Sequence, residues 1–273
     1  MYINDLAHAL IPVAQQAGAA IMQVYDDEHR PHYKSDRSPV TDADHAAEEI
    51  ILGALARIAP GIAAVAEEQA SLGHIPEIGS SFFLVDPLDG TKEFLKRNGE
   101  FTVNIALITD LGPVFGLVYA PAFGECYVTM TASQVMRFQL PPAKTPTAFE
   151  DLAAETVNPP SSGGQGLIAM VSRSHQNAAA REFLSRLPIA GLREMGSSLK
   201  FCALARGEAD IYPRFTPTNE WDIAAGHAIL NATGGCVRSE RGEPLTYGKK
   251  EENFLNPPFL AWRRVSDAES VLT

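Results

Sequence analysis

The chain has 273 residues, of which 45% are hydrophobic and 20% charged, and its formal net charge at pH 7 is −11. This composition is ordinary for a globular protein, and the length allows one large domain or two compact halves with a sizeable core. The negative charge argues against a nucleic-acid polymer as partner, because proteins that bind one carry clustered basic surface.

The first half of the chain predicts two helices followed by a series of strands. Apolar residues recur at helical spacing over 6–24 and again over 42–58, where Pro60-Gly61 ends the second helix. Short apolar or alternating runs then predict strands over 62–66, 82–85, 101–107, 114–119, 125–130 and 134–138.

The second half alternates strands with helices, and a stretch rich in Pro and Gly precedes it. Strands are expected over 167–171, 209–212 and 236–238, and helices over 177–186, 198–206 and 222–232. The sequence therefore predicts an α+β half at 1–140, a linker at 141–166 and an α/β half at 167–273.

No segment predicts secretion or a membrane span. The first 25 residues favour an amphipathic helix over a signal peptide, and no apolar run approaches the ~20 residues that a span requires. The cysteines Cys126, Cys202 and Cys236 are widely spaced and odd in number. They predict buried thiols in a reducing cytoplasm, not a disulfide framework or a metal site.

The segment that carries the strongest chemical signal is Asp86-Pro87-Leu88-Asp89-Gly90-Thr91. Two carboxylates three residues apart at the end of a buried strand are costly to desolvate unless a cation lies between them. Pro87 stiffens the turn, Gly90 lets a ligand approach the backbone, and Thr91 begins a helix whose free N–H groups favour an anion. A cation beside an anion indicates a metal-bound phosphate.

Further acidic residues lie at the boundaries of the expected elements, namely Asp42 with Asp44, Glu67 with Glu68, and Asp222. Mg²⁺ prefers oxygen ligands and keeps several of its waters. Two such ions about 3.5–4 Å apart could clamp the attacking water and the leaving oxygen of a phosphoryl transfer. No spacing of His and Cys indicates zinc.

Three motifs in this order resemble those of the Mg²⁺-dependent, lithium-sensitive inositol monophosphatase superfamily. They are Ala66-Glu67-Glu68, the segment from Asp86 to Thr91, and Glu220-Trp221-Asp222-Ile223-Ala224-Ala225-Gly226. Three ordered motifs are far more specific than one short pattern. The resemblance implies an α+β fold, a layered αβαβα sandwich of the sugar-phosphatase (inositol monophosphatase-like) type.

Within the superfamily the chain is most similar to the CysQ branch, the 3'(2'),5'-bisphosphate nucleotidases. The segments that carry this similarity lie at 91–94, 98–104, 172–175, 196–202, 212–214 and 217–219. The resemblance implies a Mg²⁺-dependent phosphomonoesterase that removes the 3'-phosphate of adenosine 3',5'-bisphosphate to give AMP and phosphate. The sulfated form of that nucleotide, PAPS, is a second candidate substrate.

The resemblance also implies a role for each matching residue. The implied ligands of two or three Mg²⁺ ions are Glu67, Asp86, Asp89, Asp222 and the carbonyl of Leu88. The implied catalytic residues are Thr91 and Asp44, which orient and deprotonate the attacking water, together with Glu67. The implied substrate contacts are Asp89, Gly90, Thr91, His175, Ser197, Lys200, Arg214 and Asp222. Among them, Lys200 and Arg214 suit a second phosphate, because charge-assisted hydrogen bonds to phosphate are strong.

Plain structural roles compete with several of these assignments. Thr41 and Asp44 match a helix capping box, Asp222 could merely favour the positive end of its helix, and His175 could be a turn residue. Glu68 is expected beside the site or facing solvent rather than as a direct ligand. Two other functions stay open: a phosphatase of inositol 1-phosphate, fructose 1,6-bisphosphate or another sugar phosphate, and a catalytically silent metal- or nucleotide-binding protein.

The chain departs from the family at 131–136, which lack the glycines of its usual hairpin, so a shorter hairpin is expected. The expected partner is a small nucleotide, with no nucleic-acid polymer and no integral membrane segment, and the protein is expected to be a monomer or homodimer. The expected location is the cytoplasm. Relatives of this branch can sit on the inner membrane surface, although no basic amphipathic helix supports that here.

Overall fold

The structure, a computed structural model, describes residues 2–26, 32–33, 39–110, 112–158, 166–174 and 177–272. Its largest sheet has seven strands whose order in space is their order in the chain. They are β3 (Ala63–Ala66), β4 (Phe82–Asp89), β5 (Thr102–Thr109), β6 (Gly112–Ala120), β7 (Glu125–Thr131), β8 (Gln134–Gln139) and β9 (Ala154–Thr156). Neighbours are antiparallel except for the parallel pair β3 and β4.

Two long helices cover one face of this sheet, α1 (Ile3–Asp26) and α2 (Asp42–Ile58). Alternate residues of a strand point to opposite faces. Phe83 and Val85 of β4 accordingly join the core under these helices, whereas Phe82 and Leu84 join the core on the other side. The alternation along β4 therefore builds two cores with one strand.

A second layer of helices lies between the two sheets. It contains α6 (Leu199–Ala205) and α7 (Glu220–Ala232), and both are apolar on nearly all sides. Trp221 and Ala225 of α7 pack on the seven-stranded sheet, whereas Ile223 and Leu230 pack on the smaller sheet. A helix that is apolar all round is the kind that a protein buries completely.

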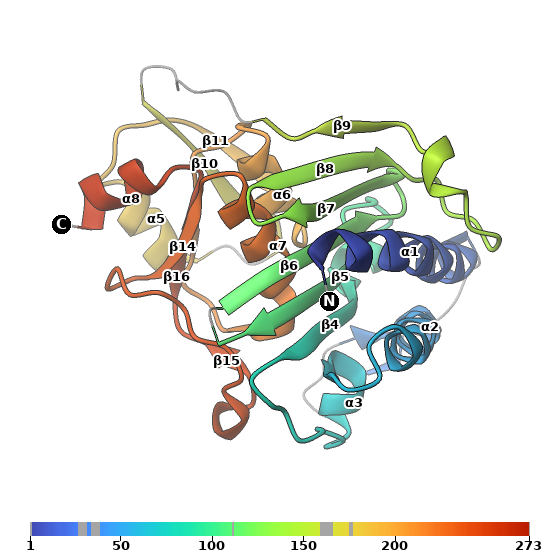
Figure 1. The fold of residues 1–273 in the computed structure, drawn as a ribbon. Coiled ribbons are helices and arrows are strands. Elements are labelled where there is room, and N and C mark those ends of the chain that lie inside the picture. Colours follow the sequence, from blue (N-terminus) through green and yellow to red (C-terminus); the bar gives the residue numbers. More distant parts are fainter. Residues whose placement is uncertain are drawn as a thin grey trace.

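The smaller sheet has five strands in the order β11-β10-β12-β16-β14. Their bounds are β10 (Leu167–Ser172), β11 (Ile189–Met195), β12 (Ile211–Arg214), β14 (Cys236–Ser239) and β16 (Phe259–Trp262). Helices α5 (Ala178–Leu184) and α8 (Val265–Leu272) cover its outer face through Leu184 and Ala268. Figure 1 shows α1 and α2 on one side of the molecule and α5 and α8 on the opposite side. The predicted αβαβα sandwich is thus confirmed.

The remaining elements of the described residues are short. They are α3 (Glu67–Ser71), α4 (Thr91–Leu95), the pair β1 (His32–Tyr33) and β2 (Pro39–Val40), the pair β13 (Thr218–Asn219) and β15 (Leu255–Asn256), and the 3₁₀ turns Phe149–Asp151 and Lys250–Glu252. Two residues separate β7 from β8, as expected for a short hairpin.

Two differences from the prediction affect the larger sheet. Strand β4 does not end at residue 85 but runs to Asp89, with a break in its pairing to β5 between Asp86 and Asp89. Pro87 has no N–H to donate, so it lies where the ladder is interrupted. In addition, the stretch 141–166 contributes β9 to the larger sheet, which therefore extends beyond residue 140. The division into two halves stays a prediction.

All three cysteines are buried and free of disulfides, as the sequence predicted. Among the described residues, no helix combines the length and the apolarity needed to cross a bilayer.

The contact between β6 and α7 gives a first prediction. A Cβ at Gly116 would lie 2.1 Å from the carbonyl oxygen of Ala225. Gly116→Ala should therefore lower the free energy of unfolding by about 2 kcal/mol, the usual cost of overpacking. Gly53→Ala is the control, because a Cβ at this exposed helical position meets nothing within 4 Å. It should be neutral or stabilise by up to about 1 kcal/mol in urea denaturation, and equal losses in both variants would contradict the packing account.

Candidate active site

A cavity of about 390 Å³ lies where the end of β4 meets the first turns of α6 and α7. Ten predicted site residues line it: Glu67, Asp86, Leu88, Asp89, Gly90, Thr91, Ser197, Lys200, Arg214 and Asp222. They come from both halves of the chain, at 67–91 and 197–222, and the fold brings them to one cavity. Asp44 is not among the lining residues, and His175 lies outside the described residues.

Three carboxylates in the cavity are close enough to share one cation. Glu67, Asp86 and Asp222 each offer an oxygen, and these oxygens lie within 4.8 Å of one another. Each comes from a different kind of position: the first residue of α3, the interrupted part of β4, and the first turn of α7. Asp222 Oδ2 also accepts the backbone N–H of Asn219 at 3.0 Å, so the expected helix-capping role coexists with its place in the cluster.

The electrostatics of this cluster favour a bound cation. Burial raises the pKa of Asp86 well above its ordinary value, and repulsion from Glu67, Asp89 and Asp222 raises it further. Burial likewise raises the pKa of Asp222, again with repulsion from Asp89 and Glu67. Such a group of acids either takes up protons or holds a cation. Because every donor is a carboxylate oxygen, the set fits a hard divalent ion such as Mg²⁺.

Two polar residues that sequence reasoning missed connect the cluster to the rest of the site. Asn104 Nδ2 lies 3.4 Å from Asp89 Oδ2 and donates to Ser198 Oγ at 3.0 Å. Ser198 Oγ in turn donates to the carbonyl oxygen of Asp222 at 2.6 Å. Both residues belong to segments that carry the resemblance, so the signal was present, but only the fold places them behind Asp89.

The contacts of Asp44 are those of a helix cap. Its Oδ2 accepts the backbone N–H and the hydroxyl of Thr41, both at 2.7 Å, which completes a capping box at the start of α2. Burial raises its pKa to about 7. Thr91 Oγ1 lies 3.4 Å from the Leu88 carbonyl oxygen, so the described contacts of Thr91 and Asp44 do not join the two side chains.

The buried carboxylate of Glu48 holds the helical turn that begins at Glu67. Glu48 accepts the backbone N–H groups of Glu68 at 2.8 Å and Gln69 at 3.1 Å, which fixes the first turn of α3 against α2. Glu68 is buried beside the cluster and is not among the residues that line the cavity. The solvent-facing alternative for Glu68 is therefore wrong, and its place outside the ligand set stays a prediction.

Three cationic residues line the same cavity as the acids, namely Lys92 on the first half and Lys200 and Arg214 on the second. The ammonium group of Lys200 donates to the carbonyl oxygens of Ser197 and Met195, the latter at 3.4 Å, and lies 5.2 Å from the centre of the Tyr212 ring. Burial lowers the pKa of Lys200 to about 8, while the charge of Asp89 acts in the opposite direction. Arg214 Nε donates to Thr218 Oγ1 at 2.8 Å.

A second cavity of about 110 Å³ adjoins the first, because Ser172 and Arg214 line both. Its other lining residues are mostly apolar or aliphatic, and they include Val171, Ala180, Leu192, Pro213 and Phe215. Acidic and cationic side chains therefore share one cavity, and a smaller, partly apolar cavity lies beside it.

Comparison with known proteins decides the family. Residues 3–271 match the inositol monophosphatase family. The chain belongs to this family. Among the relatives of this family member, the 3'(2'),5'-bisphosphate nucleotidase CysQ of Shigella flexneri is 43% identical over 249 residues, which cover 90% of this chain and 95% of that protein. The protein of the same name from Escherichia coli strain K12 is 42% identical over the same shares.

Solved structures of the family agree with the fold. CysQ of Bacteroides thetaiotaomicron superposes with a TM-score of 0.78 at 34% identity, covering 96% of this chain and 99% of that one. An inositol monophosphatase of Thermotoga maritima has a TM-score of 0.76 at 20% identity, covering 98% of this chain and 96% of that one, and supports the fold alone. Enzymes of this family depend on metal ions, which agrees with the acidic cluster.

The repulsion within the cluster predicts how Asp222→Asn will behave. Mg²⁺ should raise the melting temperature of the wild-type protein, because a ligand that binds only the folded state stabilises it. Without metal the variant should melt at the same temperature or higher, since one repelling charge is gone. In Asp222→Asn, Mg²⁺ should no longer raise the melting temperature. Glu251→Gln, which alters an exposed acid, should keep the increase, and an unchanged Mg²⁺ response in Asp222→Asn would contradict the assignment.

The buried acids of α2 predict a pH dependence of the metal-free protein. Burial raises the pKa of Glu48 from 4.5 to about 7. The folded state then binds the proton more tightly than the unfolded state, so this stabilisation is complete below pH 4.5 and is lost as pH rises to about 7. Glu48→Gln should reduce the stability difference between pH 4.5 and pH 7.5 by about 2 kcal/mol in urea denaturation with chelator. The neighbouring exposed Glu49→Gln should leave it unchanged. If Glu48→Gln keeps the full wild-type difference in stability between pH 4.5 and pH 7.5, Glu48 is not the source of this pH dependence.

Proposed function

We propose that the protein is a Mg²⁺-dependent 3'(2'),5'-bisphosphate nucleotidase that removes the 3'-phosphate of adenosine 3',5'-bisphosphate, giving AMP and phosphate. The observation that carries the proposal is the pairing of a carboxylate cluster with Lys200 and Arg214 in one cavity. Relatives 42–43% identical over 90% of the chain bear the name of this activity. PAPS, which has the same 3'-phosphate, is a second proposed substrate.

The metal would be held by the acidic side of the cavity. We assign two or three Mg²⁺ ions to Glu67, Asp86, Asp89 and Asp222 with the carbonyl of Leu88. Bound Mg²⁺ supplies a water of lowered pKa and stabilises charge on the leaving oxygen. The close approach of oxygens from Glu67, Asp86 and Asp222, with the raised pKa values of the two aspartates, supports the assignment.

Thr91 and Asp44 would manage the proton of the attacking water. The Thr91 hydroxyl lies in the cavity at the start of α4, where it can orient a water. A hydroxyl is a weak base and needs a carboxylate to draw the proton away. Asp44, whose pKa is raised to about 7 by burial, would accept it near neutral pH. This pairing rests on the resemblance, since the described hydrogen bonds of Asp44 go to Thr41.

The cationic and apolar regions would bind the rest of the nucleotide. Lys200 and Arg214 would hold the phosphate that is not cleaved, with Ser197, Gly90 and His175 as further proposed contacts. The smaller cavity beside Arg214 suits an apolar ring system. Inositol 1-phosphate has neither a second phosphate nor a base, so it leaves both regions without a function.

The remaining proposals concern partners and location. The proposed partner is the small nucleotide alone, and the proposed state is a monomer or homodimer. We propose a cytoplasmic location because all three thiols are free, as is usual in a reducing compartment. A catalytically silent binding protein is disfavoured, because the full set Asp44, Glu67, Asp86, Asp89, Thr91 and Asp222 is present.

The substrate assignment is tested by phosphate release in Mg²⁺ from adenosine 3',5'-bisphosphate and, in parallel, from inositol 1-phosphate. We expect kcat/KM to be at least about a hundredfold higher for the nucleotide, since the buried cation of Lys200 and the half-buried cation of Arg214 would lack a phosphate partner with the wrong substrate. Asp89→Asn, which removes a ligand charge, is the blank and should release no phosphate. A preference for inositol 1-phosphate would refute the nucleotide assignment while leaving the metal site in place.

Lys200→Met tests the reading of the second phosphate while it keeps the volume of the buried side chain. KM for adenosine 3',5'-bisphosphate should rise about tenfold or more, because one charge-assisted hydrogen bond to phosphate is lost. KM for adenosine 3'-monophosphate should change little. Lys250→Ala, on a remote 3₁₀ turn, is the control and should match the wild type with both. Equal losses on the two substrates would mean that Lys200 does not contact the second phosphate.

A further inference from the structure

The turn that carries the cationic side of the cavity is held from the other half of the chain. This turn, Met195 to Ser197, joins β11 to α6 and precedes Lys200 by one helical turn. Ser197 adopts φ +45°, a left-handed conformation that is unfavourable for a residue with a Cβ. Such a turn needs contacts from outside to keep its shape.

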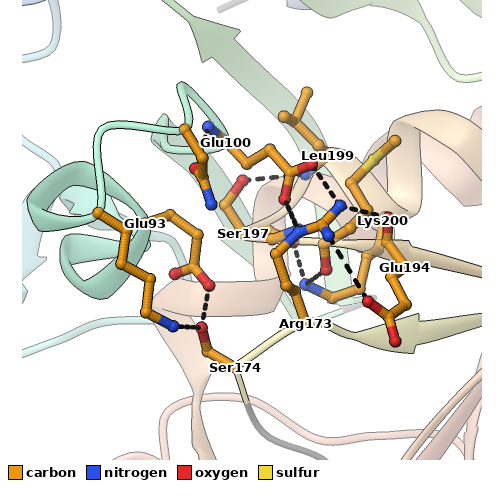
Figure 2. A network of polar contacts seen from close by, with 12 residues as sticks. Glu93, Glu100, Arg173, Ser174, Glu194, Ser197, Leu199 and Lys200 are labelled. Atoms are coloured by element: carbon orange, nitrogen blue, oxygen red, sulfur yellow. Dashed lines mark hydrogen bonds and ion pairs between the residues drawn. The ribbon is translucent and has the colours of Figure 1, made fainter.

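Glu100 supplies those contacts. Its Oε2 accepts the backbone N–H of Gly196 at 2.8 Å, and its carboxylate receives Arg173 through two further bonds of 2.8 Å, from Nε and from Nη2 (Figure 2). Arg173 Nη2 also donates to the carbonyl oxygen of Glu194 at 3.0 Å. One carboxylate thus joins the segment before β5 to the ends of both β10 and β11.

Backbone packing at the same place leaves little room for movement. A Cβ at Gly196 would lie 2.8 Å from the carbonyl oxygen of Glu100 and 2.6 Å from Cγ of Glu93. A Cβ at Gly90 would lie 3.1 Å from that carbonyl oxygen and 3.3 Å from Cβ of Ser197. The backbone of Glu100 therefore lies between the turn of the metal motif at Gly90 and the turn at Gly196.

A second contact runs beside the first. The Ser174 hydroxyl donates to Glu93, a buried residue that lines the cavity, and Lys96 Nζ donates to Ser174 Oγ at 3.0 Å (Figure 2). The residues that follow β10 are therefore fastened twice to the segment between α4 and β5.

The position of the Lys200 ammonium depends on this turn. Its hydrogen bonds go to the carbonyl oxygens of Met195 and Ser197, which are the turn itself. If the turn relaxes, the ammonium group follows it, while the carboxylates of Glu67 and Asp86 on the first half and of Asp222 on α7 stay in place. The expected consequence is weaker binding of the phosphate that is not cleaved, with the chemical step preserved.

We propose that Glu100 and Arg173 form a positioning pair that sets the affinity for the second phosphate of the substrate by fixing the Met195–Ser197 turn and, through it, Lys200. This inference rests on the proposed function, because it assumes a substrate with two phosphates. Neither residue contacts the reacting phosphate in this account.

The test uses Glu100→Gln, which keeps the shape and an acceptor for Gly196 but removes the nearer of two carboxylates that pair with Arg173, the other being Glu194 at 3.5 Å. In Mg²⁺, the Kd of AMP, which retains only the second phosphate, should rise about tenfold by isothermal titration. KM for adenosine 3',5'-bisphosphate should rise to a similar extent, with kcat within about twofold of the wild type. KM for adenosine 3'-monophosphate should not change.

Arg173 and a matched ion pair provide the controls. Arg173→Gln should reproduce the effect, the double variant should be no worse than either single variant, and Arg173→Lys should recover part of the affinity. Glu125→Gln breaks a comparable pair with Arg137, since the side chains of Glu125 and Glu100 are 21% and 16% exposed. It should leave AMP binding unchanged.

The outcomes separate this inference from the proposed function. Equal AMP affinity in the wild type and Glu100→Gln overturns the positioning pair and leaves the nucleotidase assignment intact. Equal losses on both substrates, or a fall in kcat alone, assign Glu100 a merely structural role and also overturn it. If the wild-type protein binds no AMP and does not prefer the bisphosphate, the proposed function fails and this inference fails with it.

Discussion

Repulsion among one buried and two half-buried carboxylates at the junction of the two sheets is the constraint on which the site depends. Oxygens of Glu67, Asp86 and Asp222 lie within 4.8 Å of one another, close enough to bind one ion, and burial raises the pKa of both aspartates. Bringing such groups together opposes folding in the absence of a cation or protons. The surrounding fold must therefore hold each carboxylate in place by other means.

The means are mostly helix caps and one interrupted strand. Asp222 is fixed by the capping box of α7, Asp86 by the break in β4 around Pro87, and Glu67 by Glu48, which caps α3. Capping and metal binding are therefore compatible roles, because a cap uses one carboxylate oxygen and leaves the other available. The apolar helix α7 adds the connection to the smaller sheet, which carries the cationic side of the cavity.

The family resemblance carried by the motifs was sufficient for the layered fold, and it named ten of the twenty residues that line the cavity. Asp86 and Asp222 are recognised from the spacing of the motifs that contain them. Helices α1 and α2 are predicted from the helical spacing of their apolar residues. The missed features depend on register between distant segments. Asn104, Ser198 and the contact of Glu100 with Gly196 follow from which strands lie side by side. Strands β9 and β11 were also missed, since neither has the continuous apolar run of a central strand.

The central claim, that opposed carboxylates from both halves form one metal site, is tested most directly by anomalous diffraction. Crystals grown with Mn²⁺ in place of Mg²⁺ should show an anomalous peak enclosed by the oxygens of Glu67, Asp86 and Asp222. Binding of Mn²⁺ only at other positions, or no peak between these three carboxylates at saturating Mn²⁺, would contradict the account.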